Sequence, residues 1–235
     1  MKLISASILA ILGLYSAAQA AVFTEAYNSG FANNGDILDG TILGWSDTRS
    51  INSIDAESIT ALSVKLNLDG GFNGDLYAYL SHDGVLVPLL NRVGVTATAP
   101  SSGFGYSNSG FDVTLSTLGT SDVHFYDRAN PTITGGQLTG TWQPDGRAIN
   151  PLGTAGSFDD ATLSRTSLDA LNGHNPNGTW TLFIADVSAG GGQSQVQSWE
   201  LDIVAVPEPA QYALIWQLVL LGWLGWRRRG LKPID

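Results

Sequence analysis

The sequence predicts an all-β fold of the β-sandwich kind, and two observations lead to this prediction. Apolar residues alternate with polar residues in several short segments, as they do in strands that bury one face. These segments are separated by turns rich in glycine, asparagine and aspartate, and the chain contains 28 glycines. The sequence shows no long helical period and no tandem repeat. Many short strands joined by such turns favour two packed sheets.

The expected strands follow one another along the middle of the chain. Leu62 to Leu68 alternates with Ser63, Lys65 and Asn67, as a half-buried strand does. The runs 76–80 and 85–90 flank Ser81-His82-Asp83-Gly84, which predicts a hairpin with His82 in a solvated turn. The same alternation predicts strands over residues 111–115, 180–184 and 199–203. Residues 21–53 form an N-terminal segment that we expect to contribute an edge strand or a loop.

The first twenty residues have the pattern of a secretory signal peptide. Lys2 supplies the positive charge, and Leu3 to Tyr15 forms a short apolar run. Ala18-Gln19-Ala20 is an A-x-A cleavage site, with Ala18 and Ala20 as its small residues. We therefore expect an exported protein whose mature chain begins at Ala21.

The end of the chain has the pattern of a membrane anchor. At about 1.5 Å per residue, the apolar run from Ala210 to Trp226 spans roughly 25 Å, near the lower limit for a bilayer core. Arg227, Arg228 and Arg229 follow at once and would hold the C-terminus in the cytoplasm. The sequence thus predicts one C-terminal transmembrane helix.

A short proline motif precedes this predicted helix. Pro207 and Pro209 cannot extend a helix, so they would keep Glu208 extended and exposed above the membrane. Residues 206–229, with this motif, the apolar span and the arginines, resemble the PEP-CTERM sorting signal of bacterial surface proteins. The resemblance implies an inner-membrane-anchored precursor. An exosortase, a membrane-embedded processing enzyme, would cut it and deliver the protein to the cell surface or extracellular matrix.

The composition between the two flanks excludes several classes of protein. Residues 21–205 include six basic and nineteen acidic residues, a formal net charge of −13. Such a surface is unsuited to nucleic acid, whose phosphates need basic partners. The chain has no cysteine, so disulfides cannot stabilise it outside the cell. Its stability must come from its core, from a bound metal or from both.

Residues 54–204 resemble the P domain of proprotein convertases, also called the P/Homo B domain. Six motifs carry the resemblance in order: Gly74-Asp75-Leu76, Leu90–Gly94, Gly140–Pro144, Leu168–Gly173, Asn177–Leu182 with Asp186, and Ser198–Ile203. The resemblance implies a jelly-roll-like β-sandwich. In convertases this domain packs on a subtilisin-like protease and stabilises it. The stretch before Ile54 is too short for such a protease, so this role does not carry over directly.

The loop from Asp69 to Asp75 is the candidate metal site. Asp69, Asn73 and Asp75 place oxygen donors at alternating positions in a glycine-rich turn, which suits calcium. The loop is not an EF-hand, because its twelfth position is Leu80 and not glutamate. The alternative is an acidic turn between two strands. Folding could bring further donors near the loop: Asp36, Asp39, Asp159 and Asp160.

Catalytic motifs do not occur in the sequence. His82, His124 and His174 form no zinc-protease motif, and there is no G-x-S-x-G nucleophile motif. We therefore expect no enzymatic activity. Trp142, Trp180 and Trp199 either pack in the core, which their strand positions favour, or form a platform on which a sugar stacks.

Taken together, these patterns predict an exported, non-enzymatic bacterial protein of the cell surface or extracellular matrix. Its expected partners are an exosortase, the membrane before processing, and exopolysaccharide or another surface protein. One alternative is a carbohydrate-binding or polysaccharide-modifying protein on the same scaffold. Another is a P domain that acts in trans on a secreted protease.

Overall fold

A computed structural model describes residues 19–98, 103–160, 162–207, 215, 216 and 218–223. Its strands lie in one compact unit and run from Ala21 to Val206. The short helical stretch at residues 215–223 belongs to a separate unit and is exposed where it is described.

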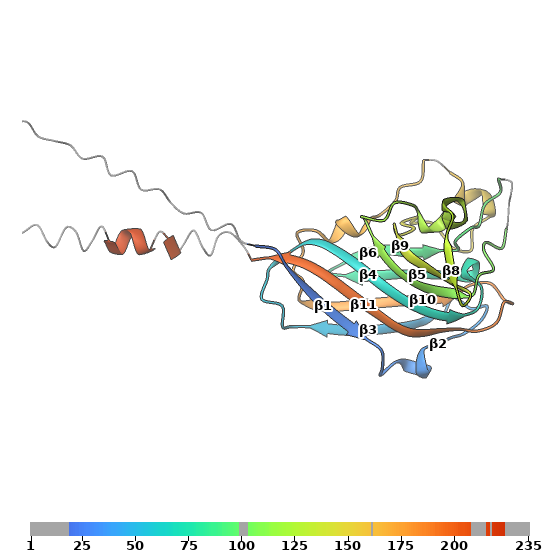
Figure 1. The fold of residues 1–235 in the computed structure, drawn as a ribbon, viewed down its shortest axis with the longest axis horizontal. Coiled ribbons are helices and arrows are strands. Elements are labelled where there is room, and N and C mark those ends of the chain that lie inside the picture. Colours follow the sequence, from blue (N-terminus) through green and yellow to red (C-terminus); the bar gives the residue numbers. More distant parts are fainter. Residues whose placement is uncertain (1–18, 99–102, 161, 208–214, 217, 224–235) are drawn as a thin grey trace, which may run out of the picture. The chain divides into compact units, whose positions relative to one another are not determined.

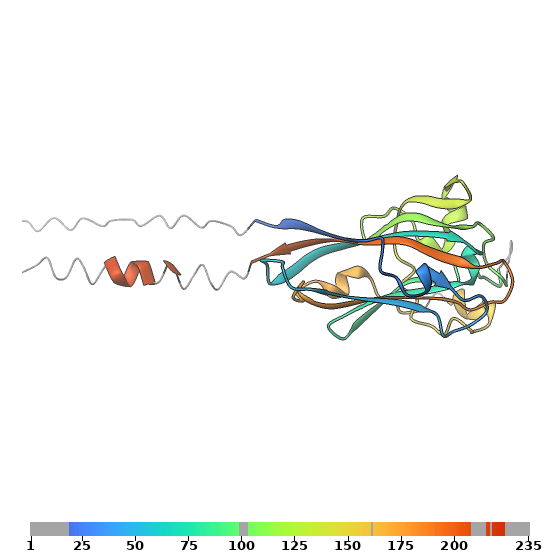
Figure 2. The ribbon, with the colours of Figure 1, turned by 90° about the horizontal axis from the view of Figure 1, so that it is seen from below.

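The strands form two sheets, shown as two layers in Figures 1 and 2. The seven-stranded sheet has the order β1-β11-β4-β7-β9-β8, with β2 also paired to β11. The four-stranded sheet has the order β3-β10-β5-β6. All pairs are antiparallel except β7 with β9. The all-β sandwich is confirmed, whereas the jelly-roll assignment stays a prediction.

The bounds of the strands are as follows: β1 Ala21–Tyr27, β2 Asp36–Ile37, β3 Trp45–Ile51, β4 Ser58–Gly70, β5 Leu76–His82, β6 Val85–Asn91, β7 Gly110–Ser116, β8 Thr132–Thr134, β9 Gln137–Trp142, β10 Gly178–Asp186 and β11 Ser194–Val206. Short 3₁₀ turns connect some of them: η1 Ala32–Gly35, η2 Asn73–Asp75, η3 Val123–Ala129, η4 Ala155–Phe158 and η5 Leu168–Leu171. Each strand predicted from alternation is present.

The sandwich also includes the N-terminal segment. β1 forms the edge of the seven-stranded sheet and pairs with β11 along its whole length. β3 forms the edge of the four-stranded sheet and pairs with β10. The two packed sheets therefore begin at Ala21, ahead of the Ile54 at which the P-domain resemblance starts.

The hairpin between β5 and β6 differs from the prediction in one residue. Asp83 and Gly84 form the turn and both have positive φ, 47° and 77°. His82, expected in a solvated turn, is instead the last residue of β5 and is 3% exposed. It points inward because it lies an even number of residues from Leu76, Ala78 and Leu80, which are fully buried.

The core fills the space between the two sheets. Alternate residues of β4, β7 and β11 face the buried residues of β5 and β10 in one continuous cluster. Trp180 and Trp199 are among its largest members and are 0% and 1% exposed. Their indole N–H groups are satisfied: Trp180 donates to the carbonyl of Pro176 at 3.0 Å, and Trp199 to the carboxylate of Asp47 at 2.8 Å. The prediction that both tryptophans are buried is confirmed.

The two ends of the sandwich lie next to each other. Ala21 pairs with Ala205 in the ladder between β1 and β11, and these strands lie side by side in both views (Figures 1 and 2). The start of β1 and the end of β11 therefore lie at the same end of the seven-stranded sheet.

The predicted membrane span from Ala210 to Trp226 falls partly outside the described residues. Within the part of the chain that is described, no helix is long and apolar enough to cross a bilayer.

Candidate functional site

The residues of the predicted processing signals lie largely outside the described part of the chain. Ala18, Glu208, Pro209 and Arg227 to Arg229 are among those not described. Ala20 is exposed directly before β1, and Pro207 is half-buried directly after β11.

The donors of the predicted calcium loop each have partners within the protein. The carboxylate of Asp69 accepts from the backbone N–H of Gly70 at 2.9 Å. Asn73 is fully buried, and its side-chain oxygen accepts from the N–H of Gly110 at 2.7 Å. The side chain of Asn73 thus closes the loop against β7, and its oxygen is already used. Asp75 has other partners, a hydrogen bond from Ser188 and the guanidinium of Arg92.

Asp75 lies instead in a cluster of three aspartates near the end of β10. Asp186 is the last residue of β10 and is fully buried, and Asp75 is 3% exposed. Asp39 is exposed in the loop after β2, where its carboxylate accepts from the N–H of Gly190 at 3.1 and 3.2 Å. Asp39 is named from the sequence as a possible further metal ligand. Asp186 is named only as part of a motif that resembles the P domain, and not as a ligand.

Backbone hydrogen bonds hold these segments together. The N–H of Val187 donates to the carbonyl of Asp75 at 2.8 Å, and the N–H of Thr41 donates to that of Asp186 at 2.7 Å. Gly191 has a φ of 85°, and a Cβ there would meet the ring of Phe72 at 2.6 Å. Only glycine therefore fits where this loop passes over Asp75.

The electrostatics of this aspartate cluster are unfavourable for negative charge. Burial raises the pKa of Asp186 to about 6, and the like charges of Asp75 and Asp39 add to this rise. Burial also raises the pKa of Asp75, although a hydrogen bond from Ser188 and the charge of Arg92 act against it. The Oδ2 atom of Asp186 is buried and has no hydrogen-bond partner within the described chain.

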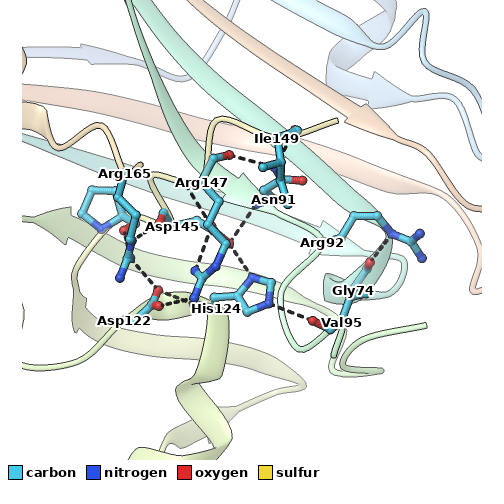
Figure 3. A network of polar contacts seen from close by, with 11 residues as sticks. Gly74, Asn91, Arg92, Val95, Asp122, His124, Asp145, Arg147, Ile149 and Arg165 are labelled. Carbon is cyan, nitrogen blue, oxygen red and sulfur yellow. Dashed lines mark hydrogen bonds and ion pairs between the residues drawn. The ribbon is translucent and has the colours of Figure 1, made fainter. Parts of the chain in front are cut away.

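Arg92 is the cation nearest to the cluster. Its Nη2 lies 3.9 Å from the carboxylate of Asp75, and its Nε donates to the carbonyl of Gly74 at 3.1 Å (Figure 3). Gly74, Asp75, Arg92 and Asp186 belong to three of the motifs that carry the P-domain resemblance. The fold thus brings these separate motifs into one place.

A second polar network lies beside it, and its carboxylates are paired with cationic side chains. Buried Asp145 binds His124 Nδ1 at 2.7 Å and Arg147 Nη1 at 3.0 Å (Figure 3). Arg147 and Arg165 each reach Asp122 at 3.0 Å. Burial would raise the pKa of Asp145, but the hydrogen bond from His124 and the charges of His124 and Arg147 outweigh it and lower the pKa. This network fastens the segment after β9 to η3 and has the features of a structural element.

The histidines are engaged in structural contacts. His124 Nε2 lies 3.0 Å from the carbonyl of Val95, so both its ring nitrogens are used. His82 stacks on Trp180 with ring centroids 3.8 Å apart, and carbonyl oxygens lie 3.0 and 2.7 Å from its two nitrogens. His174 pairs with Asp83 at 2.8 Å near the surface. Neither buried histidine has a nitrogen left to act as a general base. The absence of enzymatic activity stays a prediction.

A pocket of about 340 Å³ lies near Arg165 and Asp169. Arg165 already donates to the carbonyls of Asp145 and Pro144 at 2.8 and 3.1 Å and pairs with Asp122. The guanidinium of Arg165 is therefore already paired within the protein, and this pocket is a poor candidate for an anion-binding site.

The tryptophans do not form a sugar platform. Trp142 is 7% exposed, and Trp180 and Trp199 are buried. Other aromatic rings gather on the outer face of the four-stranded sheet. Tyr79 and Phe183 stack with centroids 4.9 Å apart, and Tyr77 lies 6.0 Å from Tyr79. These three side chains are only partly buried.

Comparison with known proteins gives a limited picture. No protein-family model matches the chain, and no curated protein matches it. Similar solved structures include the complex of the Aeromonas sobria serine protease with the chaperone ORF2, and the serine protease of Aeromonas sobria. The first has a TM-score of 0.44 and 16% identity over 81% of this chain and 28% of that chain. The second has a TM-score of 0.43 and 16% identity, and the match covers 80% of this chain and 27% of that chain. The chain thus spans about a quarter of the length of these structures, and a likeness at this level carries no inference about function.

Proposed function

We propose that this chain is an exported bacterial protein whose β-sandwich is displayed at the cell surface or in the extracellular matrix after cleavage at both ends. The observation that supports the proposal is the extent of the fold. β1 begins at Ala21, the residue after the A-x-A site, and β11 ends at Val206, the residue before Pro207. The A-x-A site therefore ends directly before β1, and the predicted sorting signal at 206–229 shares only Val206 with β11.

Cleavage at these positions would leave every strand intact. The sandwich stays closed because Ala21 and Ala205 are paired in neighbouring strands. A cut several residues inside either end would remove part of β1 or β11, which supply the pairing at one side of the seven-stranded sheet. The exosortase proposed from residues 206–229 would thus release a complete domain.

N-terminal sequencing of the protein from the cell envelope tests export. The expected first residue is Ala21. A protein that still begins at Met1 in that fraction would contradict signal cleavage. An intact start at Ala21 combined with an uncut C-terminus would support export but reject release.

Carbohydrate binding is a second candidate function, favoured by the outer face of the four-stranded sheet. The aromatic group of Tyr77, Tyr79 and Phe183 lies beside a row of hydroxyl side chains, in which Thr48 and Thr181 are hydrogen-bonded at 3.0 Å. Among the described outward-facing residues of β3, β5 and β10, none is charged. In a domain with a formal net charge of −13, such a face suits a neutral polysaccharide better than a charged partner.

Binding to exopolysaccharide from the same bacterium tests this second candidate. Tyr79→Ala should weaken binding about tenfold or more, because it removes a ring from the face. Thr60→Ala, on the exposed face of the other sheet, is the matched control and should bind like the parent. Equal binding by the parent and Tyr79→Ala would reject this face.

Action in trans on a secreted protease is a third candidate. It is supported by the way the P-domain-like motifs around Asp75, Arg92 and Asp186 come together. Purified protein mixed with a subtilisin-like protease from the same culture should raise the melting temperature of the protease. An unchanged protease melting curve and no stable complex would reject this candidate.

A further inference from the structure

The strongest unexplained feature of the molecule is the Oδ2 atom of Asp186. Its sister atom, Oδ1, accepts from the N–H of Ser188 at 3.3 Å. Oδ2 itself is buried and has no hydrogen-bond partner within the part of the chain that is described. Buried polar groups almost always have partners, and an unpaired one costs free energy. The backbone N–H of Gly40 also acts on this carboxyl group, but no described donor makes a hydrogen bond of normal geometry to Oδ2, so a further ligand at Oδ2 would offset this cost.

The neighbourhood indicates that this partner is positively charged. Asp75 is buried beside Asp186, and Asp39 adds a third carboxylate nearby. Arg92 is the only cation that acts on both Asp75 and Asp186 among the described residues, and it lies 3.9 Å from Asp75. One guanidinium cannot balance three carboxylates. A divalent cation bound between Asp75 and Asp186 would balance the remaining negative charge and give the Oδ2 atom of Asp186 a partner.

We propose that the carboxylates of Asp75 and Asp186 bind a calcium ion where the loop after β10 meets η2 and the loop after β2. Calcium is favoured because the available donors are carboxylate and carbonyl oxygens on loops, which meet its loose geometric requirements. Two carboxylates match its double charge. The site differs from the loop predicted from the sequence because Asp69 and Asn73 take no part in it.

Asp39 is not a ligand as the structure stands. Both of its carboxylate oxygens accept from the N–H of Gly190. In agreement, the described residues contain no group of three or more His, Cys, Asp or Glu side chains placed to hold a metal. The calcium ion would therefore complete its coordination with backbone oxygens and water, as calcium does in many proteins. Asp39 contributes through its charge.

Calorimetric titration of calcium chloride into chelator-treated protein at pH 7.5, followed by thermal melting, tests the proposal. The parent should bind one calcium ion per chain. At a hundredfold excess over Kd, calcium should raise the melting temperature by about 5–10 °C, because a ligand of the folded state stabilises it by mass action. The absence of calcium binding in the parent would overturn the proposal by itself.

Two variants locate the site. Asp186→Asn keeps the shape of the side chain but removes its charge, and it should lower calcium affinity at least tenfold while the protein stays folded in chelator. Asp69→Asn is the matched control from the sequence-predicted loop and should bind calcium like the parent. The reverse result, loss of binding in Asp69→Asn and normal binding in Asp186→Asn, would overturn the proposal. If Asp186→Asn fails to fold, Asp75→Asn replaces it with the same expected outcomes.

Discussion

At the scale of single residues, the environment of a carboxyl group decides whether it stabilises the fold. Asp145 and Asp186 are both fully buried. Asp145 has His124 and Arg147 as partners, so its pKa is lowered and its charged form is stabilised. Burial raises the pKa of Asp186, and the like charges of Asp75 and Asp39 add to this rise. The two residues should therefore respond to pH in opposite directions.

The raised pKa of Asp186 predicts that the protein loses stability as pH rises in calcium-free buffer. Its pKa in the folded protein is about 6, above the ordinary value of 3.8, so the folded state holds the proton more tightly than the unfolded state. The stabilisation from this proton is complete below about pH 4 and is lost as pH rises through 6. The loss is on the order of 3 kcal/mol, because each tenfold difference in proton affinity between the two states corresponds to about 1.4 kcal/mol.

Chemical denaturation of the parent and of Asp186→Asn at pH 4 to 7, both in chelator, measures this effect. The variant cannot lose a proton here, so the parent should lose stability relative to the variant across this window. A constant difference between the two proteins from pH 4 to 7 would show that Asp186 titrates normally.

At the scale of secondary-structure elements, two buried tryptophans join strands, one within the four-stranded sheet and one between the two sheets. Trp180 lies on β10 and stacks on His82 of β5. Trp199 lies on β11 in the other sheet and donates across the core to Asp47 of β3. Each indole therefore contributes both buried area and a specific contact, and each strand depends on it for its position.

Replacing either tryptophan should destabilise the sandwich strongly. Trp180→Ala and Trp199→Ala should each lower the free energy of unfolding by about 3–5 kcal/mol, because a large cavity replaces a buried ring. Leu118→Ala provides the control: this side chain is 87% exposed and its loss should change stability little. Denaturant titration gives all three values. Parent-like stability in both tryptophan variants would contradict their role in the core.

The strands that sequence analysis found are those whose alternation is clean. In β5, β7 and β10, and in residues 62–68 of β4 and 199–205 of β11, apolar residues face the core at every second position. In β3 the alternation fails because Asp47 points inward to bind Trp199, and Arg49 stacks on Tyr27 at 4.8 Å. β8 is only three residues long and is exposed. Such strands form through partners distant in sequence, which a local pattern cannot reveal.

The candidate site was predictable only in part for the same reason. Alternating oxygen donors singled out Asp69, Asn73 and Asp75, but the fold uses Asn73 to bind Gly110 of β7. Asp186, 111 residues further along the chain than Asp75, reaches Asp75 through β-sheet pairing of β10 with β5, which joins Asp186 to Leu76. Asp186 and the glycines at 190–192 can be read from the sequence, but their proximity to Asp75 cannot.

At the scale of the whole molecule, the limits of the sandwich and of the predicted signals agree. The last strand ends at Val206, two residues before Glu208 of the predicted processing motif. Glu208→Ala should therefore leave the domain folded but block processing, and cells should accumulate a longer, membrane-bound precursor. Immunoblotting of membrane and surface fractions measures this, with Glu57→Ala, outside the motif, as the control. Normal release of the Glu208→Ala protein would show that the motif is not the processing signal.

Mass spectrometry of the protein released from the cell surface tests most directly whether the sandwich is exported and freed from its anchor. The predicted result is an N-terminal peptide that begins at Ala21 and a C-terminal peptide that ends close to Pro207, Glu208 and Pro209. Peptides from residues 214–226 should then occur only in the membrane fraction. Their presence in the released protein would show that the tail is kept, and it would contradict the proposed cleavage.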